Sequence, residues 1–263
     1  MVKRQRSVRV RQRDQALLPR VQQLKADHPA WGYRRIWAYL KYREGLLVNK
    51  KRIYRLMREH RLLAHQTRRL RASRTPLRPK PHSDRPNELW GIDMTKILVP
   101  SWGWMYLHVV LDWGSKKIVG YELSRQSKTG DWLRPLQRAV NRQFPHGLRE
   151  SEKLRLVSDN GCQPTSVRFM QECRALGVEQ IFTSYDNPKG NADTERVIRT
   201  LKEDLIWPRE WLAVEELEQA LARWVDEYNK DYPHSAIGYQ TSQPFEASFQ
   251  PQPSTQWTPQ FTT

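Results

Sequence analysis

Three acidic residues lie where a carboxylate could take part in chemistry. Asp93 falls inside the run 89–99, which has the composition of a strand, and Asp159 directly follows the short apolar run 154–158. Glu195 lies near the start of a segment with helical periodicity. Any one of them alone would more often form a turn or favour a helix dipole. Together they supply the carboxylates that a divalent-metal site needs.

Clustered carboxylates suit the cutting of phosphodiester bonds, a reaction that builds negative charge on an already anionic centre. A pair of divalent ions can activate the nucleophile, stabilise the pentacoordinate state and hold the leaving oxygen. Mg²⁺ prefers carboxylate, water and phosphate oxygens, and Mn²⁺ can substitute for it. We therefore predict that Asp93, Asp159 and Glu195 are catalytic and bind two Mg²⁺ ions. Because carboxylates repel one another, the metal-free site is expected to be strained or mobile.

The segment 191–205 is expected to be the helix that carries Glu195. Asn191, Glu195, Arg199 and Lys202 share one of its faces at i, i+4, i+8 and i+11. The face expected to pack on a sheet is apolar and consists of Val197, Ile198, Leu201 and Leu205. Arg199 and Lys202 follow the carboxylate by one and two turns, so we predict that they contact DNA phosphates.

The chain after residue 86 is expected to form a mixed α/β domain. Alternation and turn signals predict five strands, at 89–99, 102–113, 117–123, 154–158 and 180–183. Helical periodicity predicts four helices, at 129–143, 165–176, 191–205 and 214–229. Three early strands followed by alternating helix and strand indicate helices layered on a central mixed sheet.

Residues 1–63 are expected to form a separate all-helical unit. Helices are predicted at 13–26, 33–42 and 50–60, the last of them with Asn49 as its N-cap. Three short helices, the third strongly basic, resemble a helix-turn-helix DNA-binding unit. DNA contact is predicted for the basic face of the third helix, which carries Lys51, Arg52, Arg55 and Arg58. A merely solvated face is the alternative interpretation.

The charge of the chain is divided unevenly. The net charge is +17, but residues 1–80 carry +20 and residues 81–263 carry −3. So basic a segment suits a polyanion, since each neutralised phosphate releases counterions. Residues 64–86, rich in proline and arginine, are expected to be a linker that tracks a phosphate backbone. The polar end, 249–263, is expected to be a flexible tail.

Composition argues against several classes of protein. No run approaches the roughly 18 apolar residues that span a bilayer, and a secretory signal is not expected, because no apolar run follows the basic N-terminus. The two cysteines, Cys162 and Cys173, cannot form a disulfide framework and lack zinc-site spacing. A reducing cytoplasm is the expected location.

Five tryptophans of the expected strands and helices could in principle stack on nucleic-acid bases. Large apolar residues at strand and helix positions are more often part of the core. We therefore expect core positions for Trp90, Trp102, Trp104, Trp113 and Trp132.

The spacing of the candidate residues resembles a known family. Between Asp159 and Glu195 lie 35 residues, and Lys202 follows seven residues after Glu195. This is similar to the D,D(35)E catalytic core of retroviral integrases and related bacterial transposases. More closely, the chain resembles the second-reading-frame product of insertion-sequence transposases of the IS-three group. The matching stretches are 28–36 (HPAWGYRRI), 85–95 (RPNELWGIDMT), 158–161 (SDNG), 190–196 (GNADTER) and 228–239, within about residues 15–248.

The resemblance implies an RNase H-like fold, that of the integrase catalytic core, for residues 87–248. It implies a DNA transposase in which water or a DNA 3′-hydroxyl attacks phosphorus in line, with no covalent protein intermediate. The implied partner is double-stranded DNA, both transposon ends and target, bound by a homo-oligomer in the bacterial cytoplasm and nucleoid. In this family an upstream reading frame usually supplies the main terminal-repeat-binding unit, so fusion or association with such a protein is expected.

The chain departs from the family's pattern at two places. Tyr232 stands where the family often has arginine, and no phosphate contact is assigned there. The segment 185–190 differs from the commonest family sequence, although its spacing to Glu195 is kept. Two other functions stay open: a non-catalytic DNA-binding regulator or domesticated element, and a nuclease of RNase H type.

Overall fold

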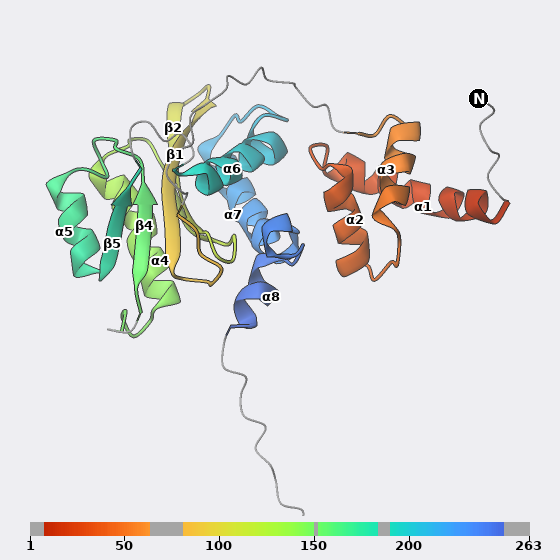
Figure 1. Cartoon of the computed structure of the whole chain (residues 1–263). Coiled ribbons are helices and arrows are strands. Elements are labelled where there is room, and N and C mark those ends of the chain that lie inside the picture. Colours follow the sequence, from red (N-terminus) through yellow and green to blue (C-terminus); the bar gives the residue numbers. More distant parts are fainter. Residues whose placement is uncertain (1–7, 64–80, 150–151, 184–189, 250–263) are drawn as a thin grey trace, which may run out of the picture.

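The computed structural model describes residues 8–63, 81–149, 152–183 and 190–249 (Figure 1). Most of the expected linker 64–86, and all of the expected tail 249–263 except its first residue, lie outside the described residues. Among the described helices, none is both long and apolar enough to cross a membrane.

The N-terminal unit consists of three helices, α1 (Val8–Asp27), α2 (Tyr33–Tyr42) and α3 (Lys50–Glu59). The bounds of α2 are those that periodicity predicts, and the Asn49 side chain caps α3 by accepting a hydrogen bond from the Lys51 N–H at 2.8 Å. Helix α1 begins at Val8, five residues earlier than predicted. Its first turns are rich in Arg and Gln, which favour helix without forming an apolar stripe.

A five-stranded sheet forms the centre of the second unit. Its strands are β1 (Leu89–Val99), β2 (Gly103–Asp112), β3 (Ile118–Ser124), β4 (Leu154–Ser158) and β5 (Val178–Phe182), in the order β3-β2-β1-β4-β5. Strands β1, β2 and β3 pair antiparallel, whereas β4 pairs parallel with both β1 and β5. The predicted mixed sheet is confirmed, with strand bounds within two residues of those expected.

Helices cover both faces of the sheet. Helices α4 (Thr129–Gln143) and α5 (Val167–Ala175) bury Trp132, Leu136 and Phe169 against one face. Helices α6 (Ala192–Leu201) and α7 (Val214–Asp231) lie together on the other face, where α6 contacts β1 and β2 and α7 contacts β3 (Figure 1). The result is a three-layered α/β unit.

Three elements of the second unit differ from expectation. The helix predicted at 191–205 is α6 followed by a π-helical turn, Lys202–Ile206, a widened turn that often marks functional sites. A 3₁₀ turn, Ser235–Ile237, and the short helix α8 (Ser242–Ala247) were not predicted. Both are too short for a helical apolar period to be visible in the sequence.

The expectation of five core tryptophans is wrong for two of them. Trp90, Trp113 and Trp132 are buried, but Trp102 is 46% and Trp104 is 55% exposed. On β2 the alternation of side chains turns Met105 inward and Trp104 outward. Trp102 and Trp104 lie where β1 meets β2 in a hairpin, and that end of the sheet face is left open to solvent.

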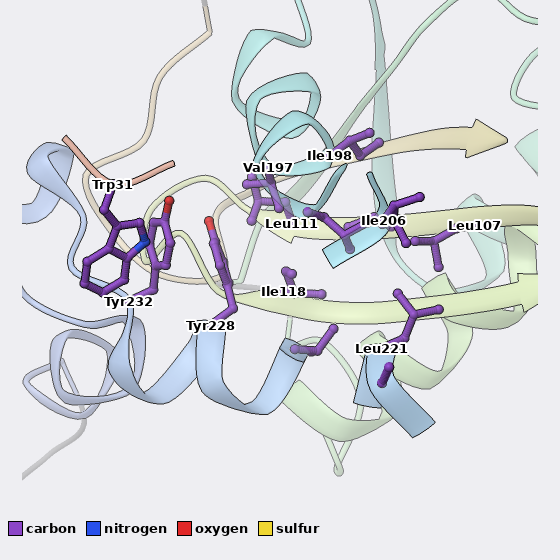
Figure 2. Close-up of a cluster of buried hydrophobic side chains, with 14 of the residues drawn as sticks. Trp31, Leu107, Leu111, Ile118, Val197, Ile198, Ile206, Leu221, Tyr228 and Tyr232 are labelled. Atoms are coloured by element: carbon purple, nitrogen blue, oxygen red, sulfur yellow. The ribbon is translucent and has the colours of Figure 1, made fainter. Parts of the chain in front are cut away.

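Aromatic side chains join the helical unit to the α/β unit. Trp31, which is 2% exposed, stands edge-on to Tyr232 with 5.5 Å between ring centroids (Figure 2). The Arg35 guanidinium lies 4.4 Å from the centroid of the Tyr232 ring. Buried residues of α1–α3 therefore belong to one hydrophobic cluster with those of α6 and α7. Tyr232, where the family often has arginine, packs in this joint.

The joint predicts a large effect for Trp31→Ala. Trp31 also stacks on His28 with ring centroids 3.8 Å apart, so truncation leaves a cavity lined by aromatic rings. The free energy of unfolding, measured by urea titration of the full chain, should fall by about 3–5 kcal/mol. The matched control is Trp207→Ala, because Trp207 is 64% exposed, and its effect should stay within about 0.5 kcal/mol. Equal effects of the two changes would contradict a packed joint.

Candidate active site

Asp93 lies in the middle of β1, on the face that α6 covers, and is partly buried. Its Oδ1 accepts a hydrogen bond from the Met94 N–H at 2.8 Å. The pKa of Asp93 is raised to about 7, and burial is the largest cause. The carboxylates of Asp159 and Glu195 contribute to this rise, while the Met94 N–H and the Lys202 ammonium oppose it. All three charged side chains are therefore within electrostatic reach of Asp93.

The parallel pairing of β1 and β4 places Asp159 beside Asp93. Gly91 pairs with Val157 in this ladder. Asp93 and Asp159 each lie two residues further along their own segment. Asp159 is exposed, and its Oδ1 accepts a hydrogen bond from the Gly161 N–H at 3.0 Å, which closes the turn after β4. A carboxylate at the C-terminal end of a parallel strand is well placed for a site.

A buried polar contact, which we call the α6 clamp, holds helix α6 against β1. The clamp consists of Gly91, Trp113, Asn191 and Thr194. The Trp113 indole N–H donates to the Thr194 hydroxyl at 3.0 Å, and the Asn191 side-chain amide donates to the Ile92 carbonyl at 3.0 Å. The side chains of Asn191, Thr194 and Trp113 are all buried, so both hydrogen bonds are shielded from water.

Gly91 makes this close approach possible. A Cβ at position 91 would lie 2.1 Å from the Thr194 hydroxyl oxygen and 2.4 Å from the Trp113 ring nitrogen. Such distances are far below van der Waals contact, so only glycine allows α6 to lie directly on the strand. Glu195 follows Thr194 on α6, so it is held near β1 by the contact at Gly91, which lies two residues before Asp93 on that strand. The side chain of Glu195 is exposed.

Lys202 follows α6 as the first residue of the π-helical turn and is partly buried. It lies close enough to Asp93 to oppose the rise in its pKa. Arg199 is different, because its side chain is 60% exposed and pairs with Glu203 at 2.9 Å. The structure thus brings Lys202, but not Arg199, into electrostatic contact with the acidic centre.

The three carboxylates have the donor chemistry of a divalent-metal site. Each supplies hard oxygen ligands, and the two neighbours destabilise the charged form of Asp93, which a bound cation would favour. Among the residues that the structure describes, no three Asp, Glu, His or Cys side chains are grouped closely enough to hold a metal as they stand.

The basic face of α3 is divided. Arg52 and Arg55 turn toward α1 and each pairs with Asp14 at 2.7 Å, so both side chains are only about a quarter exposed. Lys51 and Arg58 are exposed to solvent. Arg52 and Arg55 lie 38 and 41 positions after Asp14 in the sequence, so helical periodicity does not reveal these ion pairs. Of the predicted DNA-contact residues, those left facing solvent on α3 are Lys51 and Arg58.

Asp112, a further acid near the sheet's end, has a structural role. It is fully buried at the end of β2, and burial raises its pKa to about 6. Its carboxylate accepts hydrogen bonds from the backbone N–H groups of Asn87, Gly114 and Ser115 at 2.9–3.3 Å. Asp112 therefore fixes the turn after β2 and the entry into β1.

Comparison with known proteins matches both units. Two family models described as integrase core domain match residues 83–188 and 176–241, and one described as HTH-like domain matches residues 12–69. One relative, from Mycobacterium tuberculosis, is named as a transposase for insertion sequence element IS986/IS6110. It is 29% identical over 218 residues, which cover 78% of this chain and 77% of its own length. The chain thus contains an integrase core domain and an HTH-like domain, and this relative is named as an insertion-sequence transposase. 

Other comparisons also lead to transposases and integrases. Transposase InsD of insertion element IS2 from Escherichia coli is 26% identical over 242 residues, 87% of this chain and 77% of its own length. Among solved structures, a chain of the simian T-cell lymphotropic virus intasome aligns with 92% of this chain and 80% of its own, with a TM-score of 0.56. At 15% identity that likeness shows the fold alone. The fold is the integrase-like, RNase H-like fold expected from the sequence.

The α6 clamp was not predicted from the sequence. Its four residues have no charge pattern or known spacing that would single them out. One signal was present, because an isolated glycine inside a strand often marks a close approach of another segment, and Gly91 is such a glycine. The sequence does not tell which segment approaches it.

The clamp predicts that Thr194→Val destabilises the protein. Valine keeps the shape of the side chain but removes the oxygen that accepts the Trp113 hydrogen bond. The free energy of unfolding should fall by about 1–3 kcal/mol in urea titrations. Thr194→Ser is the matched control, since it retains the hydroxyl, and it should recover most of the loss. A valine variant as stable as the wild-type protein would show that the hydrogen bond is not needed.

Proposed function

We propose that this protein is a DNA transposase that cuts DNA strands at the ends of its element and joins them to target DNA, using Asp93, Asp159 and Glu195 as catalytic residues. The observation that carries the proposal is the convergence of charge on Asp93. Asp159, after a strand end, and Glu195, near a helix start, both raise the pKa of Asp93 on the middle strand β1. Structural acids rarely gather from three separate elements around one carboxyl group.

We propose that the three carboxylates hold a pair of Mg²⁺ ions, which Mn²⁺ can replace. When bound, these ions activate the attacking oxygen and stabilise the charge that develops on phosphorus and on the leaving oxygen. Asp93 anchors the site because β1 is rigid and paired on both sides. Asp159 and Glu195, both exposed, can close on the metal from the flanking loop and helix.

The other residues of the site position DNA. In each step the oxygen of water or of a DNA 3′-hydroxyl forms a bond to phosphorus, and the bond to the leaving 3′-oxygen breaks. The attacking oxygen gives up its proton, and the leaving oxygen departs as the new strand end. We assign Lys202 to a phosphate beside the acidic centre, a role supported by the electrostatic reach of its ammonium to Asp93. We assign Arg199, which is exposed and pairs with Glu203, to a phosphate further along the duplex.

We further propose that residues 1–63 bind duplex DNA, joined by the linker 64–86 to a catalytic core at 87–248, with 249–263 as a tail. The basic N-terminal charge and the HTH-like match support this division. A homo-oligomer bound to two element ends, aided by fusion or association with an upstream-frame protein, is the proposed assembly. The proposed location is the bacterial cytoplasm, on nucleoid DNA.

The triad predicts a specific loss of activity. Asp93→Asn, Asp159→Asn and Glu195→Gln should each reduce Mg²⁺-dependent cleavage and joining of element-end duplexes by at least about a thousandfold, because each removes a charged metal ligand. Omission of divalent metal should abolish the activity of the wild-type protein. Gel assays with labelled duplexes measure both steps.

Two controls separate this proposal from the alternatives. Duplex binding by all three variants should match the wild-type protein, which shows that folding and DNA contact are intact. Asp226→Asn removes an exposed acid of α7 that pairs with Lys230 and should leave cleavage unchanged. Undiminished cleavage by the triad variants would refute the assignment. Faster turnover of RNA–DNA hybrid than of element-end duplex would instead identify a nuclease of RNase H type.

For the helical unit we predict that Lys51→Glu and Arg58→Glu weaken duplex binding. Both side chains are exposed on α3, so the change removes favourable phosphate contacts without breaking an internal ion pair. Binding titrations across salt concentrations should show a lower affinity and a salt slope reduced by about one ion per residue. Arg168→Glu, an exposed change on α5, is the charge-matched control. An unchanged slope for both α3 variants would remove this face from the interface.

A further inference from the structure

The hairpin between β1 and β2 presents an exposed aromatic surface. Leu98, Trp102 and Trp104 are 51%, 46% and 55% exposed. Leu98 and Trp104 are direct cross-strand partners, and the next pair on the same face is Lys96 with Tyr106. Single exposed apolar residues are ordinary, but three within one hairpin, two of them tryptophans, indicate an interaction surface.

Two cations are interleaved with these rings. The Arg125 guanidinium lies 4.0 Å from the centroid of the Trp102 ring, and the Lys96 ammonium lies 5.5 Å from the centroid of the Tyr106 ring. Within the described ranges, no carboxylate forms an ion pair with Arg125 or Lys96. Both side chains are exposed, so their charge is available to a ligand.

We propose that this hairpin patch, formed by Lys96, Leu98, Trp102, Trp104 and Arg125, binds unpaired nucleotides of single-stranded DNA. Bases without a partner strand expose flat faces that stack on tryptophan in any sequence, while neighbouring cations bind the backbone phosphates. A continuous duplex hides its base faces and would use only the two cations. The patch has both kinds of contact side by side.

Charge argues against other occupants. The N-terminal unit of a second copy is unsuited, because residues 1–80 carry +20 and would bring cations against Lys96 and Arg125. The segment 64–80 of this chain contains no acidic residue and several arginines, so it is equally unsuited. A polyanion with flat apolar faces satisfies both the tryptophans and the unpaired cations.

The patch is separate from the candidate active site. Along β1, side chains alternate between the two faces of the sheet, so Lys96 and Leu98 point away from the face that carries Asp93. Leu98 also lies roughly 17 Å further along the strand, at about 3.3 Å per residue. Nucleotides bound at the patch are therefore not those whose phosphodiester bond would be cut, and their binding needs no metal.

The test is direct binding of a fluorescently labelled oligothymidylate to the full chain without divalent metal, compared with a duplex of equal length. Trp102→Ala and Trp104→Ala should each weaken single-strand binding by about five- to a hundredfold and change duplex binding less than twofold. Lys96→Ala should weaken single-strand binding severalfold and reduce its salt slope by about one ion. These substitutions are at exposed positions, and melting curves should match the wild-type protein.

Trp207→Ala, an exposed tryptophan outside the patch, is the matched control and should leave both affinities unchanged. Unaltered oligothymidylate binding by both patch tryptophan variants would overturn the proposal, as would an equal loss for Trp207→Ala. Conversion of an oligomer to a monomer by Trp104→Ala, seen by light scattering, would assign the patch to a second copy instead. Because the assay contains no metal, its outcome is independent of whether the triad cuts DNA.

Discussion

The direct contact of helix α6 with strand β1 is the constraint on which the rest of the site depends. With glycine at position 91, the Thr194 hydroxyl and the Trp113 indole can occupy the space where a side chain would otherwise stand. The Asn191 amide then bonds the carbonyl of Ile92, one residue before Asp93. These buried hydrogen bonds fix the start of α6, and Glu195 is the next residue along that helix from Thr194.

The sheet supplies the remaining geometry. Strand β1 is the central strand, antiparallel to β2 on one side and parallel to β4 on the other. The parallel neighbour β4 ends at Ser158 beside the middle of β1, so Asp159 follows next to Asp93. The cost is electrostatic, because a partly buried carboxyl between two others holds its proton more tightly, and the pKa of Asp93 is raised to about 7. Lys202 offsets part of this repulsion from the end of α6.

Much of this arrangement could be predicted from the sequence because it follows from local patterns. Alternation and periodicity located all five strands and the helices α2 and α4 within about two residues. Contacts between distant residues were less visible. Nothing near Arg52 or Arg55 indicates that Asp14 neutralises them, and nothing near Gly91 indicates that Thr194 fills its place. The exposure of Trp102 and Trp104 depends on where helix coverage of the sheet ends, which only the folded chain defines.

The central claim is that carboxylates from β1, the end of β4 and α6 form one metal site. Anomalous diffraction at the manganese edge, from crystals of the full chain with an element-end duplex and Mn²⁺, tests it most directly. We expect manganese peaks within coordination distance of the Asp93, Asp159 and Glu195 carboxylates, next to a DNA phosphate. Manganese bound elsewhere, or bound to Asp93 with Glu195 turned away from the metal, would contradict it.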